Sequence, residues 1–186
     1  QWTKEYEGGL LVSPTSPRDK NVLGISIAGV SVKNSNNFPA FFSTLQRETQ
    51  ASFSEFTLTV PKLKIQQGLV FVDSNDLTQG LVHLPGSALP GEKGNVFISG
   101  HSALSPLFSF KKAPFSNLTD LKKGDEIMVE AAGIKFRYQV VELKVVDPQD
   151  LSVINAPETS GRYITLMTCV PPGLNYKRLI VLGKMV

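Results

Sequence analysis

Hydrophobic and polar residues alternate with a period of two over much of this chain. Between positions 135 and 140, the even positions hold aromatic or aliphatic residues and the odd positions hold charged or amide residues. Such alternation is typical of a β-strand that buries one face. Similar alternating or apolar runs predict strands at 56–60, 69–72, 81–83, 95–99, 127–130, 136–146, 163–168 and 178–182. Proline and glycine separate these runs, so the chain is predicted to be mostly β, a barrel or sandwich with short helices in its connections.

The first fifty residues have a weaker pattern. Partial alternation at 22–32 predicts a strand, the segment 34–39 should end it, and 41–50 fits either a short helix or another strand. We therefore expect an N-terminal extension at 1–52, which forms either an extra strand layer or a lid, and a barrel at 53–186. Helical turns are expected at 103–110 and at 149–153, in the connections between strands.

Composition limits the classes of function. The 186 residues can bury a sizeable core, and the net charge of +3 is mild. Lysine and arginine are scattered and do not interleave with aromatic residues, which argues against a nucleic-acid partner. No apolar run approaches the 18 residues of a membrane span. Because Gln1 is an unusual natural start, we expect that a signal or membrane anchor lies outside this chain.

The candidate chemistry centres on Cys169, the only cysteine. A single thiol excludes an internal disulfide and suits an exported enzyme, because no second cysteine can trap it. If the strands at 163–168 and 178–182 pair antiparallel, Cys169 and Arg178 meet at one end of a sheet. A fixed positive charge beside a thiol favours the thiolate, which is the nucleophile. A cysteine nucleophile also needs an acid/base group.

His101 directly follows a predicted buried strand, where an imidazole could supply that acid/base function. Each residue also has a plain structural interpretation. Cys169 could be a small buried hydrophobe, Arg178 a solvated charge at a strand edge, and His101 a turn residue bonded to the backbone. For His83, the second histidine, a structural hydrogen bond is the favoured interpretation.

Taken together, these segments resemble the sortases, the cysteine transpeptidases of the Gram-positive cell surface. Thr165-Leu166-Met167-Thr168-Cys169 is similar to their TLxTC signature, and 178–181 is similar to the arginine strand that follows it. The segment 94–101 resembles the one that carries their histidine. The segments 58–65 and 121–125 resemble their opening strand and the turn before their fifth strand. The resemblance covers about residues 53–186.

The resemblance implies an eight-stranded sortase-type β-barrel and a reaction. A sortase cysteine attacks the Thr-Gly carbonyl of an LPxTG-like sorting signal on a secreted protein and forms a thioacyl-enzyme. An amine of a cell-wall precursor or a pilin lysine then takes the acyl group. Cys169 would be the nucleophile, His101 the acid/base and Arg178 the group that holds the carbonyl or oxyanion. The resemblance also places substrate-binding walls at Ser99, Leu166 and Thr168, and places the enzyme at the outer face of the cell membrane or in the cell wall.

The sortase class stays open. The proline-rich spacing between Cys169 and Arg178 resembles the pilin-polymerising class, whose lid usually carries an Asp-Pro-aromatic anchor. The nearest match is Asn37-Phe38-Pro39, which has a different order, so a housekeeping or divergent anchoring class is equally compatible. Acidic residues that could form a calcium site are scattered, at Asp73, Asp76, Glu92 and Glu158. We expect no metal and no cofactor.

Two other functions remain open at this point. One is a hydrolytic cysteine peptidase that uses the same cysteine and histidine; papain-like enzymes place cysteine before histidine and contain more helix, which disfavours that fold. The other is a surface-binding module that kept the barrel and lost catalysis. The joint presence of Cys169, His101 and Arg178 argues against it.

Overall fold

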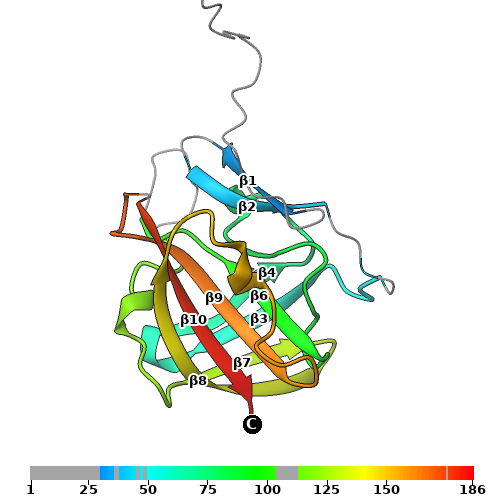
Figure 1. Cartoon of the computed structure of the whole chain (residues 1–186). Helices are drawn as coiled ribbons and strands as arrows, with labels where there is room; N and C mark the ends of the chain where they lie inside the picture. Colours follow the sequence, from blue (N-terminus) through cyan, green and yellow to red (C-terminus); the bar gives the residue numbers. More distant parts are fainter. Residues whose placement is uncertain (1–29, 36–37, 45–46, 48–49, 104–112, 175) are drawn as a thin grey trace, which may run out of the picture.

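Eight strands close into a barrel with the order β10-β8-β7-β3-β4-β5-β6-β9, as seen in a computed structural model (Figure 1). The strands are β3 (Glu55–Val60), β4 (Ile65–Phe71), β5 (Leu81–His83), β6 (Gly94–Ser99), β7 (Glu126–Ala131), β8 (Ile134–Val146), β9 (Arg162–Val170) and β10 (Lys177–Met185). The structure describes residues 30–35, 38–44, 47, 50–103, 113–174 and 176–186. The prediction of an eight-stranded, mostly β barrel is confirmed.

Local pattern accounts for most of these strands. Each predicted strand overlaps one barrel strand, and β8 buries Tyr138 and Val140 while Arg137 and Gln139 are exposed, as the alternation predicts. The connections contain short 3-10 helices: η1 (Pro61–Leu63), η2 (Leu77–Gln79), η3 (Leu118–Asp120) and η4 (Leu151–Ile154). The helical turn expected at 149–153 corresponds to η4. The turn expected at 103–110 lies almost wholly outside the described residues.

The barrel wall buries hydrophobic residues on both of its faces. Alternate residues of β9, including Ile164 and Leu166, point into the inner core. Met167 of β9 instead belongs to a second cluster on the outer face, with Phe97 of β6 and Ile180 of β10. Because neighbouring residues of a strand point to opposite faces, Cys169 lies on the same outer face as Met167. The outer cluster therefore ends, on β9, two residues before Cys169.

An N-terminal hairpin lies outside the barrel (Figure 1). Strands β1 (Val30–Ser35) and β2 (Phe38–Ser43) pair antiparallel, so the break expected across 34–39 is narrower than predicted. Pro39 lies within β2, opposite Asn34. A two-stranded sheet has two free edges, and an edge position lets proline do without a ladder N–H. Of the two structures expected at 41–50, a helix or a strand, the strand is correct for 41–43. Most of the strand expected at 22–32 lies outside the described residues.

Phe41 docks this hairpin on the barrel. Its side chain is 5% exposed and belongs to the outer cluster, with its ring centroid 5.7 Å from that of Phe97. Leu151 and Val153 of η4 cover the same cluster from the connection between β8 and β9. Phe41 and η4 thus cover the outer cluster, whose member Met167 lies two residues before Cys169 on β9.

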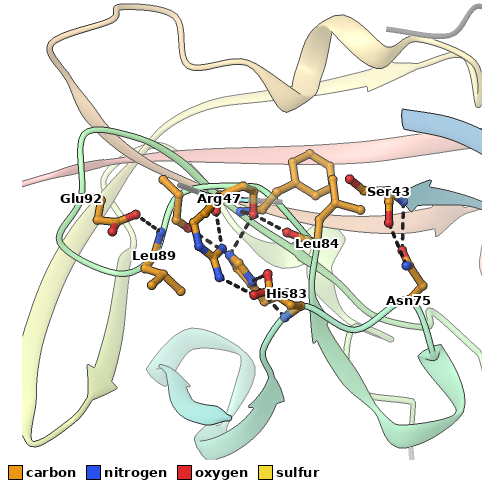
Figure 2. Close-up of polar contacts among 11 residues, drawn as sticks. Ser43, Arg47, Asn75, His83, Leu84, Leu89 and Glu92 are labelled. Carbon is orange, nitrogen blue, oxygen red and sulfur yellow. Dashed lines mark hydrogen bonds and ion pairs between the residues drawn. The ribbon is translucent and has the colours of Figure 1, made fainter. Parts of the chain in front are cut away.

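Polar contacts continue the docking beyond Phe41 (Figure 2). Ser43 and Asn75 exchange two hydrogen bonds of 3.0 Å through the Ser43 backbone and the Asn75 amide. Arg47 donates to the Ser87 carbonyl over 2.7 Å and forms an ion pair with Asp73. Ser43 and Arg47 are therefore bonded to the connections on either side of β5.

Replacing Phe41 with alanine should lower the free energy of unfolding by about 3 kcal/mol, because a buried aromatic ring is lost from a packed cluster. Urea unfolding measures this change. Ile134→Ala is the matched control, since Ile134 is 58% exposed on β8 and its loss should change stability by less than about 0.5 kcal/mol. Equal stability of the two variants would contradict the docking of the hairpin through Phe41.

Candidate active site

Cys169 and Arg178 lie side by side on the neighbouring strands β9 and β10. In the antiparallel ladder between β9 and β10, Cys169 is the direct partner of Arg178, one pair from the loop that joins the strands. Directly opposed residues in such a ladder hold their Cβ atoms about 5 Å apart. The convergence expected from the sequence is therefore present in the fold. The thiol is partly buried, and the guanidinium is fully buried.

His101 comes to the same end of the sheet from β6. Strands β6 and β9 run parallel, with Ser99 opposite Met167. His101 and Cys169 each come two residues after this pair, so both residues lie at the same end of the two strands. Backbone contacts continue past the strand end, because the Gly100 N–H donates to the Met167 carbonyl over 3.1 Å. His101 itself is 4% exposed.

The loops beyond the strand ends border the site. The Phe115 N–H donates to the His101 carbonyl over 2.9 Å, which ties His101 to the segment that begins at Ala113. On the other side, a Cβ built on Gly173 in the β9–β10 loop would lie 3.6 Å from the Cβ of Ala103. Ala103 and Gly173 therefore lie close together, just past the ends of β6 and β9.

Burial controls the protonation of the site. It raises the pKa of the Cys169 thiol, and the Arg178 charge lowers that pKa only in part. Burial also lowers the pKa of His101. Both shifts favour the uncharged forms, a thiol and a neutral imidazole. The sequence-based expectation has the right sign for the effect of Arg178, but burial outweighs it.

Comparison with known proteins identifies the family. The Sortase domain model matches residues 58–186. The chain belongs to the sortase family. It is 32% identical over 154 residues to Sortase D of Bacillus subtilis (strain 168), which covers 77% of this chain and 73% of the relative. Sortases are cysteine transpeptidases that anchor or polymerise surface proteins at the Gram-positive cell surface, and this chain is an enzyme of that kind.

Solved sortase structures have the same barrel. A lid mutant of sortase A from Corynebacterium diphtheriae matches with a TM-score of 0.64 and 30% identity, over 75% of this chain and 73% of that one. A pilus-related sortase C of Group B Streptococcus matches with a TM-score of 0.63 and 34% identity, over 74% of this chain and 69% of that one.

No helix among the described residues is long and apolar enough to cross a membrane.

The three residues predicted to form the substrate-binding walls, Ser99, Leu166 and Thr168, are all buried. Leu166 is fully buried in the inner core, on the face opposite Cys169. Ser99 is 5% exposed at the end of β6. Thr168 is 2% exposed, and its hydroxyl donates to the Gly100 carbonyl over 2.7 Å. Substrate binding by these residues stays a prediction. Leu166 packs in the inner core, and the buried Thr168 lies on the same face of β9.

The second histidine of the sortase has the surroundings of a structural residue. His83 lies on β5, fully buried, and its Nε2 is 3.0 Å from the Ala88 carbonyl and 2.8 Å from the Ser87 hydroxyl. Its Nδ1 lies 3.5 Å from Oδ1 of Asp73. Burial raises the pKa of Asp73, but the hydrogen bond to His83 and the charge of Arg47 outweigh it, so the pKa lies below its usual value. This network supports the β5–β6 connection.

Sequence reasoning missed Gly100 as part of the site. A Cβ at this position would lie 2.6 Å from Leu81 Cδ2 and 2.8 Å from Phe115 Cδ2, distances that real Cβ contacts do not tolerate. Only glycine therefore lets the chain before His101 pass between these two side chains. The Gly-His order was visible in the sequence, but the two packing partners come from distant segments.

Proposed function

We propose that this sortase cleaves an LPxTG-like sorting signal of a secreted surface protein and transfers the acyl part to an amine. The acceptor is an amine of a cell-wall precursor or a pilin lysine. Cys169 is the nucleophile, His101 the acid/base, and Arg178 the donor to the carbonyl oxygen. The observation that carries the proposal is the direct cross-strand pairing of Cys169 with Arg178. Strand β6, which pairs parallel with β9, ends two residues before His101 and so supports the role of the histidine.

Acylation starts from a thiol and a neutral imidazole, the forms that burial favours. As Sγ of Cys169 attacks the scissile carbonyl carbon, the thiol proton passes to His101. The carbonyl oxygen becomes negative, and the buried guanidinium of Arg178 stabilises it without transferring a proton. The C–N bond then breaks, and the His101 imidazolium gives its proton to the leaving amine. A thioester on Cys169 and a free amine remain.

Transfer reverses these steps with a new amine. The acceptor amine loses a proton to His101 and attacks the thioester carbon, the C–S bond breaks, and the thiolate of Cys169 regains the proton. An amide forms and the enzyme is restored. Water in place of the amine would give hydrolysis by the same steps, so access of the acceptor decides between the two products.

The remaining parts of the proposal concern the whole molecule. Residues 53–186 act as the catalytic barrel, and residues 1–52 act as an extension that contacts it through Phe41. The chain works at the outer face of the cell membrane or in the cell wall, anchored by a segment outside the given chain. The family's action at the Gram-positive cell surface supports this placement.

Mass spectrometry of the intact protein tests the proposal. Incubation with a small library of LPxTG-type peptides should add the mass of the acyl fragment to the enzyme, and peptide mapping should locate it on Cys169. Addition of triglycine, or of a peptide with a free lysine, should remove the adduct and yield the ligated product of the preferred acceptor. An adduct released only by water would indicate a hydrolytic peptidase. Peptide binding without any adduct would indicate a binding module.

A further inference from the structure

Thr168 precedes the nucleophile but does not share its face of the sheet. Ile164 and Leu166 of β9 point into the inner core, and Thr168 has the same parity along the strand. Its partner on β10 is Leu179, which also belongs to the inner core. Thr168 is 2% exposed. Thr168 therefore lies on the inner face of β9, beneath the outer face that carries Cys169.

The Thr168 hydroxyl bonds to the chain that carries His101. It donates to the Gly100 carbonyl over 2.7 Å, across 68 residues of sequence, which is the usual length of an O–H···O bond. That carbonyl belongs to the planar peptide group that joins Gly100 to His101. Holding its oxygen therefore restricts rotation of the peptide group and fixes the Cα of His101.

The strand that carries the nucleophile holds both polar groups of Gly100. The Gly100 N–H donates to the Met167 carbonyl, and the Gly100 carbonyl accepts from Thr168. These are the two residues immediately before Cys169. Packing leaves no room for even a methyl group at Gly100, because Leu81 and Phe115 lie against it. These bonds hold the backbone before His101 in a fixed position relative to β9.

We propose that Thr168 is a positioning residue, whose hydroxyl bond to Gly100 sets the distance and orientation of the His101 imidazole relative to the Cys169 thiol. The inference rests on the proposed roles of Cys169 and His101. The Thr168 hydroxyl bonds to the Gly100 carbonyl, so its loss acts on proton transfer through the placement of His101. Reactions that depend on such geometry lose up to about 10²-fold in rate for a displacement near 1 Å.

Thr168→Val removes the hydroxyl and keeps the shape. It should lower kcat by roughly 10-fold or more with KM unchanged within about twofold. Thr168→Ser keeps a hydroxyl and should restore most of the rate. Thr165→Val is the matched control, because the buried Thr165 hydroxyl also bonds from β9 to β6, to Asn95 over 3.0 Å, but four residues before the cysteine. The control should retain kcat.

A second readout does not depend on turnover. The rate of Cys169 alkylation by iodoacetamide, followed against pH, should show one inflection from the thiol and one from the neighbouring His101. Thr168→Val should weaken the histidine inflection, while Thr168→Ser and Thr165→Val should keep it. If Thr168→Val does not fold, Thr168→Ala replaces it, with thermal unfolding as the check on folding.

Two results would overturn the proposal. One is a Thr168→Val enzyme with the wild-type alkylation profile and wild-type kcat. The other is a rise in KM at constant kcat, which would make Thr168 a substrate contact. If the wild-type enzyme cleaves no sorting peptide, the proposed function fails, yet the alkylation profile still decides whether Thr168 positions His101.

Discussion

Replacing Cys169 with alanine should abolish the thioacyl-enzyme and lower the rate of peptide cleavage by at least about 10³-fold, because the covalent path loses its nucleophile. A fluorogenic LPxTG-type peptide measures cleavage, and intact-protein mass measures the adduct. The chain has no other cysteine that could replace Cys169. The thiol is only partly buried, so the variant should unfold within about 1 kcal/mol of the wild type.

Cys169→Ser separates the reaction from binding. A serine hydroxyl has nearly the shape of the thiol, but it ionises far less readily and should give little cleavage. Both variants should bind the peptide as the wild type does, because they change only the attacking atom. Cleavage that survives Cys169→Ala at more than one-tenth of the wild-type rate would assign the nucleophile to another residue.

The strands could be read from the sequence because their signal is local. In β8, alternation over a few residues determines which side chains are buried, and in β9 and β10 a short turn fixes the pairing. The expected meeting of Cys169 and Arg178 followed from those two strands alone, and the observed ladder contains that pair. Register is well determined where each strand has one face in the core.

The surroundings of the site could not be read in this way. The bond between Thr168 and Gly100 spans 68 residues, and Phe41 reaches Phe97 from a hairpin outside the barrel. Such contacts depend on the closed strand order, in which β6 and β9 become parallel neighbours. No local pattern encodes that adjacency.

Burial is the second quantity that the sequence did not supply. From the residues alone, a positive charge beside a thiol suggests an easily ionised cysteine. In the fold, burial raises the pKa of Cys169 by more than the charge of Arg178 lowers it. The sign of a pKa shift at such a site depends on how much water the fold excludes, which becomes known only with the packing.

Replacing Arg178 with glutamine should lower kcat by about 10²–10³-fold, because the developing oxyanion loses a charged donor in a buried site. It should also shift the alkylation of Cys169 to higher pH. A positive charge stabilises the thiolate, so its removal adds to the effect of burial and raises the pKa of Cys169 further. Iodoacetamide rates against pH measure this shift, and single-turnover cleavage measures the rate.

Two further variants distinguish charge from geometry. Arg178→Lys keeps the charge but loses the planar fork of donors, so the alkylation profile should remain close to wild type while kcat stays low. Lys177→Gln removes the neighbouring charge, which is exposed and paired with Asp147. Because solvent screens that charge, neither measurement should change. An unchanged alkylation midpoint in Arg178→Gln would show that the guanidinium charge does not act on the thiol, and an unchanged kcat would make Arg178 a structural residue of β10.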